Sequence, residues 1–245
     1  MTQKRIRLRT PVGSASGAEP QDHAVGRAGP RDSAPLGPAV STLESRETQA
    51  RELENAGHVD RAIELYLAIL REEPEHLSAH YALGQLYDRT GRHLEALEQF
   101  ERAKRIDPDN VDLLVNHANV GAVLGRFEGA ERDLRRAARL DPTRAAVFET
   151  LGMMQFRRGL YAQAEQELRR AVELDPDSPT ALHYRGEALN QLGRVDEAMA
   201  MLERAVTISP ANPRTWYLMG ILLDRKHRPQ EAAAMFRKAR ALTPI

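Results

Sequence analysis

Two histidines and two glutamates come closest to a reactive site in this sequence. His76 and His80 are four residues apart, a spacing that can hold a metal ion on one helix, but a proline-terminated helix ends just before His76 and no third ligand is evident. Glu149 and Glu187 could form a carboxylate pair for acid–base catalysis, yet nothing near them suggests a shifted pKa or a substrate pocket. We therefore predict no catalytic residue, no metal site and no cofactor.

Charge balance and motif content argue against several other chemistries. The 245 residues hold 35 Lys and Arg against 35 Asp and Glu, and no cysteine. Zero net charge disfavours nucleic acid as a partner, and the lack of cysteine excludes disulfides, thiolate metal sites and cysteine nucleophiles. Phosphate-binding glycine loops and the HExxH and GxSxG motifs are absent. Acids interleave with and cancel the one recurring basic row, which is Arg102, Arg136, Arg170, Arg204 and Lys238.

A 34-residue period organises the elements that must position any site. It is marked by a proline in each of six units: Pro74, Pro108, Pro142, Pro176, Pro210 and Pro244. Internal repeats of this length indicate a solenoid, in which each unit contacts mainly its neighbours and no single globular core forms. The expected activity of such a chain is binding.

Columns of equivalent residues show how each unit is built. The position twelve residues before each proline never grows beyond a methyl group, which indicates a close contact between helices: Ala62, Ala96, Ala130, Ala164, Ala198 and Ala232. In the first five units a glycine lies between the two helical patterns, where it can end the first helix in a left-handed conformation: Gly57, Gly91, Gly125, Gly159 and Gly193. In the sixth unit His227 replaces this glycine. Each unit therefore reads as helix, tight turn, helix and proline stop.

These columns resemble the tetratricopeptide repeat family over residues 43–245. The second unit carries the clearest match, in Leu83, Gly84, Tyr87, Gly91, Ala96, Phe100, Ala103 and Pro108. The repeats are predicted at residues 43–76, 77–110, 111–144, 145–178, 179–212 and 213–245. Departures from the family pattern are Gln49, Ile69, His117, Gly121 and Arg185. The resemblance implies an all-α fold, a right-handed α-solenoid of six helix-turn-helix units, whose first helices form a concave inner wall.

Peptide or protein segments usually lie along that wall in this family. Projecting the same face onto this chain gives an apolar middle flanked by aromatic and arginine residues, of the kind that interfaces favour. Phe156 is open to a second interpretation, in which its ring folds back into the core because Gln155 holds the usual aromatic site. The predicted groove residues are Tyr81, Gln85, Arg89, Val115, Asn119, Val123, Glu149, Met153, Phe156, Arg157, His183, Asn190 and Tyr217.

Two specialised forms of the family do not match these columns. The carboxylate clamp of chaperone-binding members would need basic residues and asparagines in adjacent units, and only Asn119 fits. The asparagine ladder of glycosyltransferase-linked members would need an asparagine in each unit, and only Asn116 is present. The partner is therefore a protein or peptide that the sequence does not identify.

The two ends of the chain differ in character. Residues 1–41 contain five prolines, five glycines and no aromatic residue, so we predict a disordered tail before a solenoid over residues 42–245. After the sixth stop proline nothing covers the last helix, which makes an association surface around Met235, Leu242 and Ile245 a hypothesis, with self-association as one outcome. No apolar run suits a secretion signal or a membrane span, so we expect a cytoplasmic protein with no membrane partner.

The predicted function is a non-catalytic scaffold or adaptor that binds a partner segment in its concave groove. The alternative is a regulatory or substrate-recruiting subunit of an enzyme complex whose catalytic chain is separate. Both would use the same groove, so the sequence does not separate them.

Overall fold

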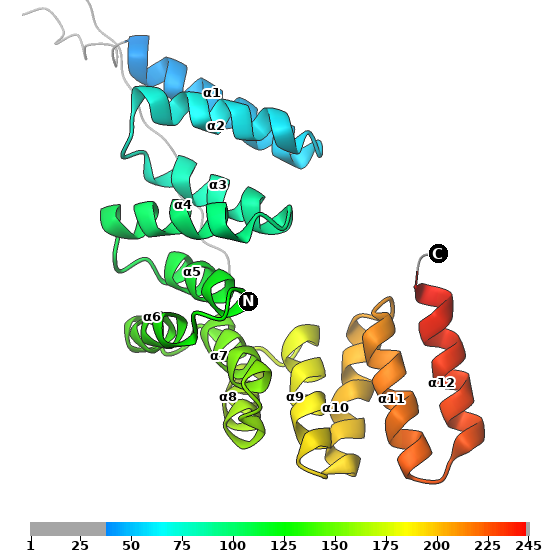
Figure 1. The fold of residues 1–245 in the computed structure, drawn as a ribbon. Coiled ribbons are helices and arrows are strands. Elements are labelled where there is room, and N and C mark those ends of the chain that lie inside the picture. Colours follow the sequence, from blue (N-terminus) through cyan, green and yellow to red (C-terminus); the bar gives the residue numbers. More distant parts are fainter. Residues whose placement is uncertain (1–37, 244–245) are drawn as a thin grey trace, which may run out of the picture. The chain divides into compact units, whose positions relative to one another are not determined.

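A computed structural model describes residues 38–243, which form twelve helices in six antiparallel pairs (Figure 1). The first helices of the pairs are α1 (Pro38–Asn55), α3 (Leu77–Arg89), α5 (Val111–Val123), α7 (Ala145–Arg157), α9 (Pro179–Gln191) and α11 (Pro213–Arg225). The second helices are α2 (Val59–Glu72), α4 (His93–Ile106), α6 (Phe127–Leu140), α8 (Tyr161–Leu174), α10 (Val195–Ile208) and α12 (Pro229–Leu242). The predicted all-α solenoid of six units is confirmed.

The helix boundaries follow from the turn chemistry. The glycine of each turn has a positive φ in the first five units, for example 76° at Gly91, and the amide of Arg92 then bonds to the carbonyl of Tyr87 at 2.8 Å. His227 adopts the same left-handed conformation with φ of 58°. Side chains cap several first helices, as where Ser178 Oγ accepts from the amide of Ala181 at 3.1 Å.

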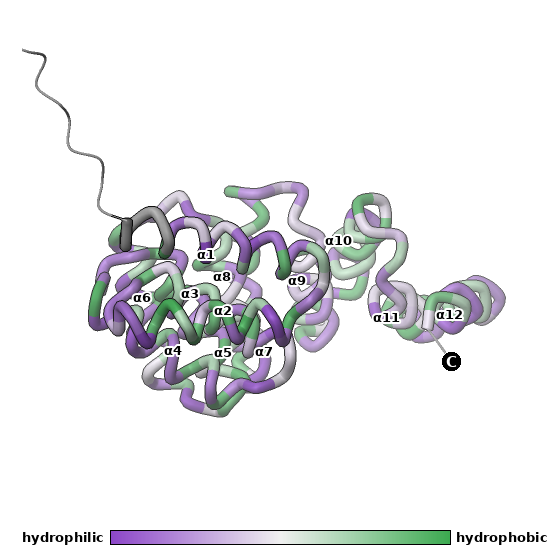
Figure 2. The backbone as a smooth tube through the Cα atoms, turned by 90° about the horizontal axis from the view of Figure 1, so that it is seen from above, coloured by the Kyte–Doolittle hydropathy of each residue, from purple (hydrophilic) through white to green (hydrophobic). Residues whose placement is uncertain are grey.

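The core is a chain of small clusters. Every residue of the alanine column is buried, and large side chains such as Tyr66, Phe100 and Leu168 pack against the small residues of the facing helix. Hydrophilic and hydrophobic residues alternate along the described helices, as expected when one side of each helix is packed (Figure 2). Stability is therefore spread along the repeat rather than held in one centre.

Helix contacts between units determine which residues share a surface. Each second helix packs on the next first helix, and successive first helices from α3 to α11 also contact one another directly. The first helices therefore share one surface, called here the first-helix face, which carries the predicted groove residues.

Residues 1–37 of the predicted tail lie outside the described residues, whereas its predicted end at residue 41 lies within them. Helix α1 starts at Pro38, inside the segment that the sequence assigned to the tail. No helix within residues 38–243 is both long and apolar enough to cross a membrane.

Candidate functional site

The predicted groove residues do not all offer free side chains. Arg89, Val123, Arg157 and Tyr217 are exposed, whereas His183 and Asn190 are only 6% exposed. The remainder are partly buried: Tyr81, Gln85, Val115, Asn119, Glu149, Met153 and Phe156. The sequence placed His183 and Asn190 on an open wall, and the structure instead buries both between units.

Hydrogen bonds between units explain that burial. Asn190 Oδ1 accepts from Arg225 Nη1 at 2.6 Å, one unit further along the chain. The hydroxyl of Thr215 lies 3.0 Å from Nδ1 of His183. Because these side chains satisfy one another, they fix the spacing of α9 and α11 rather than face a ligand.

The same type of bond occupies two further groove residues. The amide of Asn116 donates to the hydroxyl of Tyr81 at 2.7 Å, which joins α5 to α3. Arg89 and Glu54 form an ion pair at 2.6 Å between the first two units. Several polar side chains of the predicted groove are therefore already used in contacts between neighbouring first helices.

Phe156 is partly buried and packs against a core cluster, which favours the second of its two interpretations. Its ring centroid lies 5.3 Å from that of Tyr161 and 5.9 Å from that of Tyr184, and it packs against buried Leu168 and Ala164. Aromatic rings at these separations and tilts attract one another, and they join α7, α8 and α9.

Five residues in the middle of the first-helix face offer polar or apolar side-chain groups that are not used within the described residues. Gln85, Asn119 and Arg157 make no side-chain hydrogen bond or ion pair within the described residues. Met153 is partly exposed on α7, one turn before Arg157, and Val123 is 42% exposed at the end of α5. Amides, a guanidinium and flexible apolar groups together can bind a peptide backbone and its side chains.

Glu149 and Glu187, the carboxylate pair considered from the sequence, both have raised pKa values. Burial raises the pKa of Glu149, and a hydrogen bond of 2.6 Å from Ser178 Oγ works in the opposite direction. Burial also raises the pKa of Glu187, against the charge of Arg214. Glu149 is tied to the cap of α9, so its perturbation accompanies a bond between units and gives no sign of a reaction.

The two histidines have separate structural roles. His76 caps α3, where its Nδ1 accepts from the amide of Ala79 at 3.3 Å. Buried His80 lies 2.7 Å from the amide oxygen of Gln99 and 2.9 Å from the carbonyl of Pro74. Within residues 38–243 no group of three potential metal ligands occurs.

The basic row is also engaged by its neighbours. Four of its arginines contact an acid or a carbonyl, such as Arg136 with Asp109 at 2.7 Å and Arg204 with the carbonyl of Pro176 at 2.8 Å. Lys238 lies 3.9 Å above the ring of Trp216. Some of these contacts lie within one helix and others connect a helix to a loop or to another helix, so each cation of the row already has a partner within the described residues.

Comparison with known proteins settles the family. The model for the C-terminal domain of cilia and flagella-associated protein 70, a tetratricopeptide repeat domain, matches residues 18–243. The chain belongs to this tetratricopeptide repeat family. Proteins of this family and fold generally act as non-catalytic scaffolds for protein binding.

Individual relatives are distant. Superkiller protein 3 of Schizosaccharomyces pombe is 34% identical over 76 residues, which is 31% of this chain and only 6% of that protein. The structure of PilF from Pseudomonas aeruginosa has a TM-score of 0.71 at 21% identity and covers 84% of this chain and 93% of that one. YrrB, described as a tetratricopeptide repeat protein with an unusual peptide-binding site, has a TM-score of 0.53 at 22% identity over 73% of this chain and 92% of that one. These solved structures share the tetratricopeptide repeat fold.

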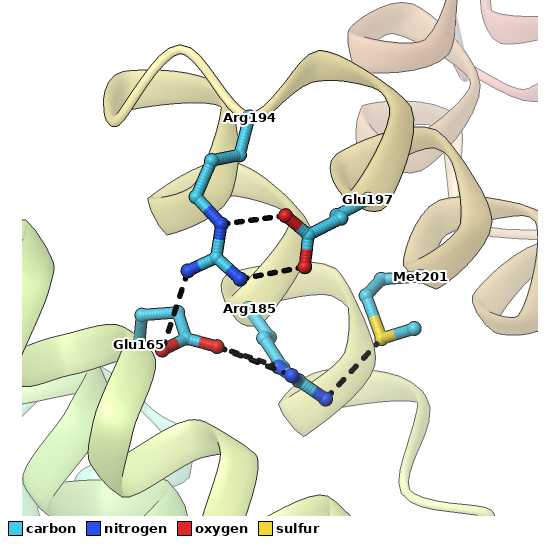
Figure 3. Close-up of polar contacts among 5 residues, drawn as sticks. All are labelled: Glu165, Arg185, Arg194, Glu197 and Met201. Carbon is cyan, nitrogen blue, oxygen red and sulfur yellow. Dashed lines mark hydrogen bonds and ion pairs between the residues drawn. The ribbon is translucent and has the colours of Figure 1, made fainter.

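One departure from the tetratricopeptide repeat pattern takes part in an ionic network around the buried carboxylate of Glu165 (Figure 3). Arg185 of α9 stands at a usually apolar site and donates to Glu165 of α8 from two nitrogens, at 3.1 and 3.2 Å. Arg194 approaches the same carboxylate at 3.7 Å and pairs with Glu197 at 2.5 Å, while Met201 Sδ accepts from Arg185 at 3.6 Å. The charge of Arg185 is therefore compensated between the fourth and fifth units.

The last unit carries an apolar hollow of about 830 Å³ between α11 and α12. Exposed Tyr217 lines it, with its ring 5.3 Å from that of Phe236. Met235 and Leu242 of the predicted association surface are partly buried against a core cluster nearby, and Ile245 lies outside the described residues. Association through this end stays a prediction.

Proposed function

We propose that this protein is a non-catalytic scaffold that binds an extended segment of a protein partner along its first-helix face. The observation that carries the proposal is the set of free groups across α3, α5 and α7. Among residues 38–243 the amides of Gln85 and Asn119 and the guanidinium of Arg157 have no partner, and Met153 and Val123 supply apolar surface on the same helices.

The chemistry of an extended segment suits these groups. A peptide without secondary structure carries free backbone donors and acceptors, which side-chain amides can satisfy from either side. Arginine and methionine are enriched at interfaces because they combine reach, polarisability and directional bonds. YrrB, which has the same fold, is described as having a peptide-binding site, and this supports the same type of ligand here.

Capture of partners by the full chain tests this proposal. The test variant combines Asn119→Ala, Met153→Ala and Arg157→Ala, all on the first-helix face. The matched control combines substitutions of exposed residues on α6 and α8 with similar chemistry: Arg139→Ala, Leu140→Ala and Gln166→Ala. Lysate of the source organism is passed over each immobilised chain, and captured proteins are quantified by mass spectrometry.

A partner retained by the native chain and the control, but lost by the test variant, is the expected result. Circular dichroism must show that the test variant keeps its helices. Equal capture by all three chains would refute binding on the first-helix face. The captured chain also separates the two functions considered, because a catalytic partner would indicate a regulatory or substrate-recruiting subunit.

A further inference from the structure

A polar hollow of about 1000 Å³ lies between the second and third units, lined by residues of α4, α5 and α6. We call it the Gly121 hollow. A Cβ atom at Gly121 would come no closer than 3.7 Å to Ala130 and 3.8 Å to the carbonyl of Arg126, which are ordinary contacts. Gly129 is similarly open, with Arg132 at 4.0 Å. These two glycines leave room where other units carry side chains.

The preceding junction shows what normally fills this place. One unit earlier, four equivalent positions are apolar or aromatic, and they pack in a single core cluster: Leu67, Leu70, Leu83 and Tyr87. Their counterparts in the Gly121 hollow are, in the same order, Glu101, Lys104, His117 and Gly121. The largest of the four side chains, an aromatic ring, is the one that has no counterpart.

The arginine that accompanies that ring is nevertheless kept. In the second unit the guanidinium of Arg92 lies 4.3 Å from the ring centroid of Tyr87, a cation–π contact. Arg126 is the counterpart of Arg92, and it lines the Gly121 hollow, where residue 121 supplies no ring. Its ion pair with Glu101 is long, at 3.8 Å. The hollow thus carries the cationic half of an arginine–aromatic pair.

His117 supplies a polar group to the same place. Its Nδ1 lies 2.5 Å from Oδ2 of Asp133 and, at a longer distance of 3.2 Å, near Nζ of Lys104, which itself donates to Asp133 at 2.8 Å. Because an ionised carboxylate only accepts, Nδ1 of a neutral His117 carries the proton and Nε2 is left as an acceptor. Nε2 is buried and has no hydrogen-bond partner within residues 38–243. A hydroxyl donor would satisfy it.

The charges around the hollow favour an acidic neighbour. Four cationic side chains, Lys104, Arg105, Arg126 and Arg132, face three carboxylates, Glu101, Glu128 and Asp133. Arg105 and Arg132 are exposed and form no ion pair among the described residues. Of the three carboxylates only Glu128 is unpaired within the same residues, so two unpaired positive charges stand beside one unpaired negative charge. Carboxylates beside an inserted ring would find these two guanidinium groups available.

We propose that the Gly121 hollow is a second binding site, which takes a tyrosine side chain from an acidic segment of a protein partner. The ring occupies the place that Tyr87 fills one unit earlier, under Arg126, and its hydroxyl donates to Nε2 of His117. Acidic residues on either side of the tyrosine pair with Arg105 and Arg132. This site is separate from the first-helix face and does not depend on binding there.

Titration of the full ¹⁵N-labelled chain with a short peptide, followed by NMR, tests the proposal. The probe is acetyl-Glu-Glu-Tyr-Glu-Glu-amide, and the amides of Gly121, Gly125 and Gly129 are the reporters. Comparison peptides replace the tyrosine by alanine or by phenylalanine, or all four glutamates by lysine. The protein variants are Gly121→Tyr, which fills the hollow with the residue found at Tyr87, and Arg126→Ala. Met153→Ala on the first-helix face is the control.

We expect saturable shifts of the reporters with a Kd of about 1 mM or tighter for the native chain and for the control. The alanine and lysine peptides should bind at least about tenfold more weakly, because ring burial under a cation and charge pairing each contribute that much. The affinity of the phenylalanine peptide should lie between those of the tyrosine peptide and the alanine peptide. Gly121→Tyr should abolish the shifts while circular dichroism shows its helices intact.

Three results would overturn the proposal. They are shifts that do not saturate, an alanine peptide that binds as well as the tyrosine peptide, and unchanged binding to a folded Gly121→Tyr variant. If Gly121→Tyr loses its helical signal, Arg126→Ala decides, since its side chain lies at the surface and its removal should still weaken binding of the tyrosine peptide about tenfold. Unchanged binding to Arg126→Ala would then refute the assignment.

Discussion

Replacing glycine by alanine should have opposite effects at two buried glycines of the first helices. Gly152 in α7 and Gly121 in α5 are both buried and helical. At Gly152 an added Cβ would lie 2.4 Å from Cγ of Leu168 and 3.1 Å from the carbonyl oxygen of Ala164. At Gly121 the nearest atoms would be 3.7 and 3.8 Å away.

The magnitudes follow from two opposing terms. Alanine is favoured over glycine inside a helix by about 1 kcal/mol, and this gain applies at both positions. Overpacking a tight site costs about 1–3 kcal/mol, and here the upper part of that range applies, because a backbone carbonyl cannot rotate away as a side chain can. We therefore expect Gly152→Ala to destabilise the chain by about 1–2 kcal/mol and Gly121→Ala to stabilise it by about 0.5–1 kcal/mol.

Urea unfolding followed by far-ultraviolet circular dichroism measures both variants against the native chain. Midpoints are compared only where the slopes agree, because a repeat protein can lose cooperativity when one unit weakens. Gly152→Ala should unfold at lower urea and Gly121→Ala at higher urea than the native chain. Shifts in the same direction for both variants would refute the proposed difference in packing around the two glycines.

Three further results are expected. His227→Gly should raise the stability by about 1 kcal/mol in the same urea assay, because a left-handed backbone costs other residues that much; a loss would show that the imidazole has a compensating contact. Glu165→Leu alone should cost about 3 kcal/mol of stability, because it leaves the mostly buried Arg185 without its partner, whereas Glu165→Leu with Arg185→Leu should recover most of that loss; equal losses would contradict a coupled pair. Burial lowers the pKa of His183 from 6.5 to about 4, so the unfolded chain takes up a proton at this residue before the folded chain does. The melting temperature should therefore fall as the pH drops from 6.5 towards 4. An equally steep fall of the melting temperature in His183→Gln would assign the effect to other groups.

Much of the fold could be predicted from the sequence because repetition isolates the physical demand at each position. A column that is alanine in six units can only be a close helix contact, and Ala164 is indeed fully buried. A glycine fixed between two helical patterns indicates a left-handed turn, and Gly91 has that conformation. Departures from the columns were also visible, as at His117 and Arg185, but the sequence offered no reason for them.

The sequence by itself determined the helix pairs, their turns and the helix face to which each residue belongs, because these depend on local backbone chemistry and on a fixed period. Only the tertiary structure decided which polar groups are already used. Asn190 reaches Arg225 and Arg185 reaches Glu165 across unit boundaries, and such pairings depend on the side-chain conformations of two neighbouring units. The Gly121 hollow has the same origin, since a missing side chain becomes a cavity only when the surrounding helices hold their positions.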